Sequence, residues 1–512
     1  MTGGRPPITG VPTSITAFVG FATRGPVDTP TPVTSLGDFA RVFGGLALTS
    51  TMSYAVRQFF ENGGQHAVVV RCTGTGAARA QSSPPGSAPG ATLTLKAVDE
   101  GFWGDQLLMR IDHDTADPAR FNLSVKDNDT RTLEAFPDLP PGPSLGPAIA
   151  ARSTLVRLDG AAPATRPDPH AVLPPGADPF DPAVPARFSS FAGGKDGAQA
   201  VTDLVPPDDD GSGMFALTGV DLFNLLVIPP VLPARDPREA RVLTPEVKGR
   251  AARFALAHRA LFIVDPDPGW HSPPDITAST GLQTSIDGIS PDERPNAALY
   301  FPYLRASDPL QGGAVMDYPP AGAIAGVFAR NDSEGGVWKA PAGLETGLLG
   351  VQGLAVSVSD QDNAVLHPLA VNCLRSFPSG TVVWGARTLA GDDSLAPEWK
   401  YVQIRRVAVF LEASLIRGIE WAVFEPNAEP LWAQLRQSVG GFMHALFAQG
   451  AFQGSTSRES YFVKCDAQTT PQADVDNGIV NIIVGFAPLK PAEFVIVRIQ
   501  QLVGQQCPDQ SL

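Results

Sequence analysis

The chain is poor in cysteine, and it has no long apolar run. Its four cysteines, Cys72, Cys373, Cys465 and Cys507, lie far apart, and none forms a CxxC pair. This spacing argues against a disulfide framework or a zinc knuckle and fits a reducing compartment. No apolar stretch reaches the ~18–20 residues that cross a bilayer, and MTGGRPPITG lacks the apolar core of a secretion signal. We therefore expect a soluble protein that folds in the cytoplasm, without direct insertion into a membrane.

The chain also lacks an excess of basic residues. The formal net charge is −14, and no basic stripe runs along the sequence. Neutralising phosphates supplies most of the affinity of proteins for nucleic acids. The charge balance therefore argues against a nucleic-acid partner.

What the chain does contain is typical of an ordered protein with several compact parts. Apolar residues make up 43% of it and charged residues 18%. At 512 residues it exceeds the ~250–300 residues over which a single core grows. Its 50 prolines and 51 glycines cluster without a period, which excludes collagen and indicates irregular loops between domains.

The first 200 residues alternate between strand and loop patterns. ITAFVGFA (15–22) and HAVVVRC (66–72) predict strands, and residues 53–64 between them have helical spacing. After the linker QSSPPGSAPG (81–90), short alternating runs up to about residue 158 predict an antiparallel β unit. The Pro/Ala-rich segment 161–188 predicts an extended tether or a surface loop.

The pattern changes after residue 214. VDLFNLLVIPP (220–230) is a continuous apolar run, as expected for a strand that is buried on both faces. A helix is predicted over 244–259, with Thr244 as the N-cap and Pro245 at its first position, and ALFIVDP (260–266) follows as another buried strand. This βαβ unit predicts a parallel sheet.

Two helices and three strands are predicted near the end of the chain. Val407, Phe410, Leu411, Leu415 and Ile419 recur at helical spacing. A second helix after EPNAEP turns a second set of apolar residues inward and ends before Gly450. That set consists of Leu431, Leu435, Val439, Phe442 and Leu446. The predicted strands are 460–465, 479–488 and 493–501.

Two short motifs match catalytic or nucleotide-binding patterns by chance. GPSLGP (142–147) has the spacing of a nucleophile elbow, but the prolines in and around it argue against the strand and the helix that an elbow needs. Gly74 and Gly76 follow a predicted strand, yet the third glycine of a dinucleotide fingerprint is missing and the linker at 81–90 ends any helix. We interpret the second motif as a turn.

The remaining chemical candidates favour structural roles. The acidic clusters at 127–129, 208–210 and 360–362 lack the spacing of a calcium loop and are interpreted as solvated loops. The seven histidines form no HExxH motif. Asp265 ends a predicted parallel strand, where α/β enzymes place chemistry, although Asp-Pro is also a common turn. We therefore expect no catalytic residue, no metal site and no cofactor.

Arg405 and Arg406 form the strongest positive pair near the C-terminus. On the predicted helix phase both lie off the apolar stripe, and Glu412 shares their helix. A surface that makes salt bridges with other proteins explains these three residues better than a phosphate site does.

The sequence as a whole resembles contractile tail sheath proteins of phage tails and phage-tail-like injection particles. The resemblance begins at GVPTSITAFVGFATRGPVDTP, continues in YAVRQFFENGGQHAVVVR and VDLFNLLVIPP, and is densest from NAALYFPYLR onward. There it includes VNCLRSFPSGTVVWGARTLAGDD, WKYVQIRRVAVFLEASLIRG, VFEPNAEPLW and DNGIVNIIVGFAPLKPAEFVIVRIQQ. Residues 81–200 match weakly, as expected for the variable outer domain of that family.

The resemblance implies a structural subunit that is not an enzyme. Identical copies would polymerise helically around an inner tube in a bacterial cytoplasm and then contract to drive that tube through a target envelope. Its implied partners are other copies of the chain, the inner tube protein, baseplate and cap proteins, and sheath paralogues. The family's middle domain is sometimes described as subtilisin-like, but the HGTH and GTSMA signatures of that protease are missing. The implied likeness is one of shape.

Two segments are predicted to link neighbouring subunits. EFVIVRIQQ (493–501) would leave a long apolar strand edge unpaired, and donating the strand to a neighbour would satisfy its backbone groups. The residues of this strand are Glu493, Phe494, Val495, Ile496, Val497, Arg498, Ile499, Gln500 and Gln501. Residues 2–12 are its predicted partner, an arm that includes Arg5, Pro6, Pro7 and Ile8.

The arm departs from the family pattern, because no PGVYVEE-like segment precedes the first strand. A shortened start, a paralogue in a special layer, and a mesh that relies more on the C-terminal strand all fit this difference. The helix 431–449, or the loop after it, is the predicted tube-facing surface, and the outward residues of the helix are Gln434, Arg436, Gln437 and His444.

We therefore predict an α/β, multidomain fold with a mixed, mainly parallel-sheet core. The predicted parts are an N-terminal arm and start of the core (1–85), an inserted β-rich outer domain (86–200), an α/β middle domain (201–395) and an α+β C-terminal domain (396–512) that strands from neighbours complete. A static capsid or fibre protein and an α/β hydrolase are the rival hypotheses.

Overall fold

The computed structural model describes residues 7–84, 90–231, 243–393 and 398–491. The chain divides into two compact units, residues 1–425 and 426–512. The first unit is built on a large sheet with an inserted β-rich part, and the second is a small α+β unit. Within the described residues, no helix is long and apolar enough to cross a membrane.

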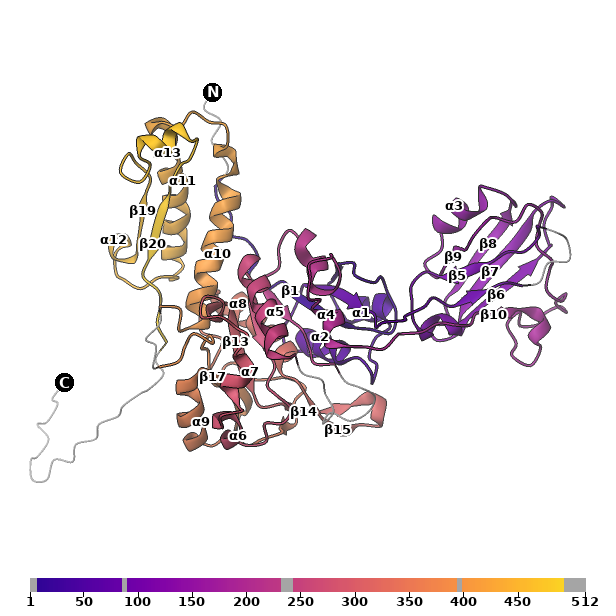
Figure 1. Cartoon of the computed structure of the whole chain (residues 1–512), viewed down its shortest axis with the longest axis horizontal. Helices are drawn as coiled ribbons and strands as arrows, with labels where there is room; N and C mark the ends of the chain where they lie inside the picture. The colour runs from indigo at the N-terminus through magenta and orange to yellow at the C-terminus, as the bar shows by residue number, and fades with distance from the viewer. Residues whose placement is uncertain (1–6, 85–89, 232–242, 394–397, 492–512) are drawn as a thin grey trace, which may run out of the picture. The chain divides into compact units, whose positions relative to one another are not determined.

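An eight-stranded sheet forms the centre of the first unit (Figure 1). In spatial order its strands are β18 (Gly380–Val383), β17 (Val371–Phe377), β13 (Ala297–Phe301), β12 (Leu261–Val264), β11 (Leu225–Val227), β1 (Thr16–Phe21), β3 (Ala67–Cys72) and β2 (Thr31–Val33). The strands from β17 to β3 run parallel, and the edge strands β18 and β2 are antiparallel to their neighbours. The predicted α/β class with a parallel sheet is confirmed.

Helices cover both faces of this sheet, which explains the continuous apolar strands. One face packs against α1 (Leu36–Phe43), α2 (Thr51–Glu61) and α8 (Ala321–Gly335). The other packs against α5 (Pro245–Ala257), α6 (Pro273–Thr277), α7 (Leu282–Ile286) and α9 (Asp360–Leu366). Along β1, Phe18 packs on the face that α1, α2 and α8 cover, and Ala17 and Val19 pack on the face that α5 covers. Successive side chains of a strand point to opposite faces.

The predicted helix starts agree with the structure. Helix α5 has Thr244 as its N-cap and Pro245 as its first residue, although the Thr244 side chain makes no capping hydrogen bond. Proline is tolerated there because the first N–H groups of a helix have no intrahelical partner. Helix α10 of the same unit spans Val402–Gly418.

The inserted part lies between β3 and β11 and consists of antiparallel sheets, as predicted for residues 91–158. One sheet contains β10 (Ser189–Ser190), β6 (Leu107–Asp112), β7 (Phe121–Asp127) and β8 (Leu133–Leu139). The other contains β4 (Gln81–Ser82), β5 (Leu95–Ala97) and β9 (Val156–Leu158), and α3 (Leu145–Ala150) packs beside β9. Alternate residues of β7 are buried, so the strand presents one apolar face to its own core.

The segment 161–188 is not a free tether, and that alternative is wrong. The buried Arg110 of β6 donates hydrogen bonds to the carbonyl oxygens of Ala171 and Arg187, 3.1 and 2.8 Å away. Lys126 of β7 lies 5.5 Å from the ring centroid of Phe180. These contacts hold the segment against the sheet as a packed surface loop.

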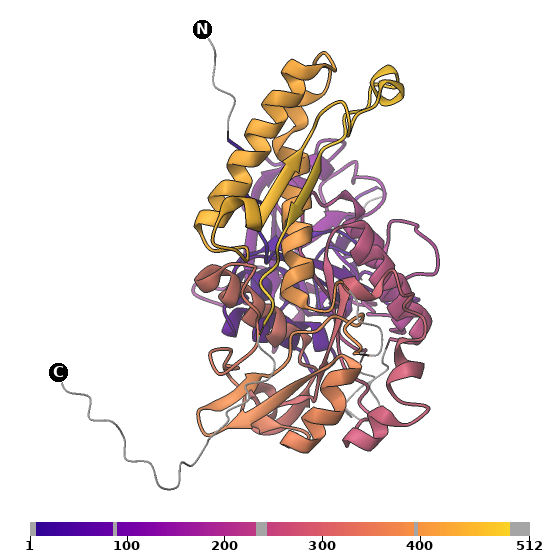
Figure 2. The same cartoon turned by 90° about the vertical axis from the view of Figure 1, so that its left-hand side faces the viewer.

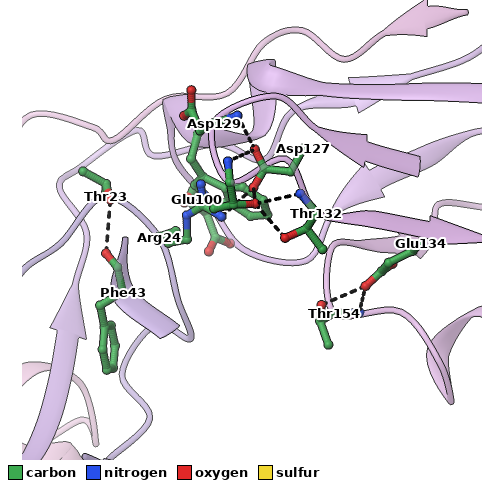
Figure 3. A network of polar contacts seen from close by, with 11 residues as sticks. Thr23, Arg24, Phe43, Glu100, Asp127, Asp129, Thr132, Glu134 and Thr154 are labelled. Atoms are coloured by element: carbon green, nitrogen blue, oxygen red, sulfur yellow. Dashed lines mark hydrogen bonds and ion pairs between the residues drawn. The ribbon is translucent and has the colours of Figure 1, made fainter. Parts of the chain in front are cut away.

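Polar contacts join the inserted part to the central sheet (Figure 3). Arg24, in the loop after β1, pairs with Asp127 at the end of β7 over 2.7 Å, and its guanidinium lies over the ring of Trp103. Asp127 is fully buried and accepts hydrogen bonds from its own turn as well. Its interpretation as part of a solvated loop is therefore wrong. Arg71 of β3 donates hydrogen bonds to the carbonyl of Gly25, which follows β1, and to the carbonyl of Glu100 in the inserted part. It therefore contacts both the central sheet and the inserted part.

Three further strands and a short helix complete the described first unit. They are β14 (Leu304–Asp308), β15 (Ala314–Tyr318) and β16 (Gly353–Leu354), which form an antiparallel sheet, and α4 (Val201–Leu204).

The second unit contains a long helix and a β-hairpin (Figure 2). Helix α11 (Glu429–Ala448) packs against β19 (Tyr461–Lys464), which pairs antiparallel with β20 (Ile483–Phe486). The short helix α12 (Ser457–Ser460) precedes β19, and α13 (Gln472–Asp476) lies in the connection between β19 and β20. All five residues predicted to point inward from α11 are buried, and Gly450 follows the helix with a positive φ.

Candidate functional site

The carboxyl ends of the parallel strands hold a buried acid, Asp265, directly after β12. One of its oxygens accepts a hydrogen bond of 2.8 Å from the backbone N–H of Ala321, the first residue of α8. Its other oxygen is buried without a hydrogen-bond partner. Burial raises the pKa of Asp265 to about 7, and the hydrogen bond from Ala321 opposes that rise. Asp265 thus caps the start of α8 through one of its oxygens.

A buried lysine lies on α5 near the same strand ends. Lys248 donates a hydrogen bond of 2.5 Å to the hydroxyl of Ser285, and burial lowers its pKa to about 8. In the part of the chain that the structure describes, no three His, Cys, Asp or Glu side chains could together hold a metal ion. The hydrogen bond of Lys248 links α5 to α7, and that of Asp265 links the end of β12 to α8.

The two short motifs have structural roles. A strand (β8) ends before GPSLGP and a helix (α3) begins at Leu145, so the expectation that prolines exclude both elements is wrong. Ser144 is exposed in this turn. The two histidines of the inserted part have other hydrogen-bond partners: His113 contacts Pro167, and His170 contacts Ile111 and Ser189. Gly74 lies against the backbone of Ala198, where a Cβ atom would come within 2.4 Å of the carbonyl carbon.

The three cysteines among the described residues are buried. Cys72, Cys373 and Cys465 are free and buried, and Cys507 lies outside the described residues. Burial raises the pKa of the Cys373 thiol to about 12, so it stays protonated near neutral pH and is a poor nucleophile.

Arg406 does not lie on a salt-bridge surface, and that prediction is wrong. Its side chain is 5% exposed, as is that of Asp332 at the end of α8, and the two pair through contacts of 2.6 and 2.9 Å. Arg406 also donates to the carbonyl of Thr13, whose hydroxyl donates to Asp332. The helix phase was misjudged because Asp332, 74 residues earlier, gives the buried guanidinium a partner.

The other two residues of the predicted surface differ from Arg406. Arg405 is partly buried, donates to the side-chain oxygen of Asn296 and lies over the Trp399 ring. Glu412 is exposed and lies 3.5 Å from Arg259, which is also exposed. Of the three, Glu412 alone has the exposed, weakly paired character that was predicted.

The described part of the N-terminal arm lies along α10 of its own chain. Ile8 is buried against Gly418, where a Cβ atom would come within 2.5 Å of the Ile8 side chain. The N–H of Val11 donates to the hydroxyl of Ser414. Ile8 is therefore committed within the protomer, contrary to its predicted role in reaching a neighbour. Pro7 is exposed, and Arg5 and Pro6 lie outside the described residues.

Three of the four predicted tube-facing residues are on the exposed side of α11. Gln434, Gln437 and His444 are exposed. Arg436 is partly buried and pairs with Glu429 over 2.6 Å while donating to the Cys465 carbonyl. The predicted linking strand, Glu493–Gln501, lies outside the described residues.

We predict that Asp265→Asn changes the pH dependence of stability. A carboxyl whose folded pKa is raised contributes stability that is complete below about pH 4 and is lost as the pH rises through about 7. Asparagine cannot ionise but can still accept from Ala321. The variant should match the parent near pH 4 and exceed it at pH 8 by on the order of 2–4 kcal/mol. Thermal unfolding from pH 4 to 8 measures this, with Asp267→Asn as the control. A variant that is less stable at pH 8 would refute it.

We predict that Asp332→Asn is far more damaging than Glu412→Gln. Leaving Arg406 buried without its charge partner should cost about 3–5 kcal/mol, whereas the exposed pair of Glu412 contributes at most about 1 kcal/mol. Chemical denaturation gives the free energies, and hydrogen exchange of residues 8–16 should show faster exchange in Asp332→Asn alone. Equal costs for the two variants would contradict the assignment.

Comparisons with known proteins agree with the resemblance seen in the sequence. Residues 394–501 match the family model of the phage tail sheath C-terminal domain. A prophage major tail sheath protein of Pseudomonas aeruginosa (strain UCBPP-PA14) is 24% identical over 194 residues, which cover 36% of this chain and 47% of that protein. The match therefore spans about half the length of this relative.

Solved structures share the fold over nearly the whole chain. A sheath tail protein of Listeria innocua has a TM-score of 0.61 at 11% identity, covering 94% of this chain and 96% of its own. The contracted sheath complex of PVC, an extracellular contractile injection system, has a TM-score of 0.56 at 20% identity, with 98% and 95% covered. A chain of the anti-feeding prophage baseplate has a TM-score of 0.54 at 19% identity, with 98% of both covered. Residues 394–501 of the chain thus match the phage tail sheath C-terminal domain, and its fold is shared with solved sheath proteins of contractile tails and injection systems.

Proposed function

We propose that this protein is the subunit of a contractile tail sheath. Copies would polymerise helically around an inner tube and contract to drive the tube through a target envelope. The observation that carries the proposal is the β-hairpin of the second unit, which lies inside the segment that matches the sheath C-terminal domain.

The hairpin is incomplete as a sheet. Strands β19 and β20 pair only with each other among the described strands, so each has an outer edge that no other described strand covers. Phe462 and Ile483 are about half exposed, at 50% and 49%, so the hairpin also has apolar surface to bury. Both properties favour the addition of strands from neighbouring subunits.

We propose residues 493–501 as the donated strand. Apart from its first residue, the first half of this strand is a continuous apolar run, and in its second half Val497 and Ile499 alternate with Arg498 and Gln500, which suits an edge position with one buried face there. A head-to-tail contact that does not close on itself builds an open helix, which a sheath requires. Ile8 and Val11 contact α10 of their own subunit. We therefore propose that only the residues before Ile8, and not the whole segment 2–12, meet the donated strand.

The exposed side of α11 is the proposed tube-facing surface. Gln434, Gln437 and His444 lie there, whereas the Arg436 charge is already paired with Glu429. Contact with the tube would therefore depend on neutral polar groups more than on opposite charge. Baseplate and cap proteins, and sheath paralogues, are the further proposed partners, and the likeness to a baseplate chain supports the first of them.

The chain would act without catalysis or a cofactor. Asp265, the acid best placed for chemistry, is used as a helix cap. The energy for contraction would be stored as the difference between two packings of the same subunits. A bias of a few kcal/mol per subunit, summed over roughly a hundred or more copies, would exceed what one ATP supplies.

Electron microscopy of the assembled particle tests the proposal. We expect long tubes before, and shorter and wider tubes after, treatment with acid or denaturant. A shell or a fibre of constant length would instead indicate a static structural protein. Stoichiometric labelling of one serine by an active-site reagent would indicate a hydrolase.

The donated strand is tested by two deletions of the C-terminus. Removing 493–512 should leave a folded subunit that does not polymerise, because the hairpin edges stay unpaired. Removing 502–512 keeps the strand and should leave tube formation intact. Both are scored by sedimentation and microscopy, with circular dichroism to confirm folding. Tubes of normal length from the longer deletion would contradict the assignment of this strand.

A further inference from the structure

The edge of β6 in the inserted part is covered by a histidine instead of a complete strand. Strand β10 pairs with β6 only at Met109 and Leu108. Two residues further on, the backbone N–H of Ile111 donates to Nδ1 of His170 over 3.0 Å, and the Ile111 carbonyl accepts from the His170 N–H over 2.9 Å. One residue of the loop 161–188 thus satisfies both edge-facing groups of Ile111.

These contacts fix the protonation of the His170 ring. Because an amide N–H can only donate, Nδ1 must be unprotonated in order to accept it. The other ring nitrogen, Nε2, lies 2.9 Å from the Ser189 hydroxyl and carries the ring proton. An imidazolium has a proton on both nitrogens, so it cannot make the bond to Ile111.

We propose that His170 is an acid-sensitive latch that holds the loop 161–188 over the edge of β6. When the ring is protonated, the bond to Ile111 breaks, the loop opens next to His170, and a strand edge is exposed. Such an edge can accept another strand. The proposal concerns the inserted part alone and does not depend on the sheath function.

The charges around the ring favour opening in acid. Arg110 of β6 faces the same loop, because it donates to the Ala171 and Arg187 carbonyls, so a second positive charge on His170 would be repelled. Arg187 itself lies 3.8 Å from Asp181. Near the end of β6, Asp112 is engaged with the Asn122 amide and the Asp114 N–H. Asp168, two residues before the ring, has partners of its own.

A neighbouring histidine contacts the loop without the same sensitivity. Nε2 of His113 lies 2.8 Å from the carbonyl of Pro167, and a carbonyl can only accept, so this nitrogen donates. Protonating His113 leaves that bond intact. His113 therefore provides a matched control.

The direction of the effect follows from the surroundings of His170. Burial, with the nearby Arg110 charge, lowers its pKa from the usual value near 6.5. The closed loop therefore prefers the neutral ring, and its stability is present above about pH 6.5 and falls as the pH drops below that value.

Hydrogen exchange on the full-length protein at pH 7.5 and pH 5.0 tests the latch, after correction for the pH dependence of intrinsic exchange. In the parent protein, peptides from 107–112 and 163–188 should lose roughly tenfold protection at pH 5.0. His170→Asn places an acceptor oxygen close to the position of Nδ1 and cannot be protonated there, so it should show no loss. His113→Gln should keep the loss of the parent.

A fixed charge gives the opposite test. His170→Lys should be open at both pH values, which keeps the proposal testable even if His170→Asn folds poorly. Equal protection of the parent at both pH values would overturn the latch. So would an undiminished acid-dependent loss in His170→Asn, or full protection in His170→Lys.

Discussion

Each backbone N–H and C=O group of a strand needs a partner, and this requirement governs all the sheets of the protein. In the central sheet, the parallel strands satisfy one another, and helices on both faces exclude water. In the inserted part, the loop that carries His170 finishes the edge that β10 leaves uncovered. In the C-terminal hairpin, the outer edges of β19 and β20 have no described strand beside them. The proposed polymer follows from this difference.

Two deeply buried ionic contacts hold the interior of the subunit together. Arg406 and Asp332 tie α10, α8 and the N-terminal segment together, and Arg24 and Asp127 fasten the inserted part to the central sheet. Buried charges tolerate little displacement, because a separated ion would remain in a medium of low polarity. Such buried ion pairs suit a subunit whose internal structure stays fixed. Its proposed contacts with neighbouring subunits depend on backbone pairing between strands instead.

Capping residues and hydrophobic periodicity predicted several helices and strands whose structure depends mainly on their own segment of the sequence. The Thr244–Pro245 helix start, the apolar face of α11 and the βαβ unit around β11 and β12 follow from capping and periodicity. Helix α8 was not predicted, because its Ala- and Gly-rich stretch AGAIAGVFAR gives a weak periodic signal when almost every side chain is buried. Helix α1 was also missed, although Ser35 caps its start and Gly44 ends it. Asp127 and Arg406 were misplaced because charged residues usually face solvent.

The sequence by itself determined the α/β class, most of the strand and helix positions and, through its long ordered resemblance, the likeness to sheath proteins. The tertiary structure alone decided which polar residues are buried. Partners such as Asp332 for Arg406, Asp127 for Arg24 and Ile111 for His170 are 59 to 103 positions apart in the chain. Periodicity reports only the environment of neighbouring residues, whereas these contacts exist only after folding has brought distant segments together.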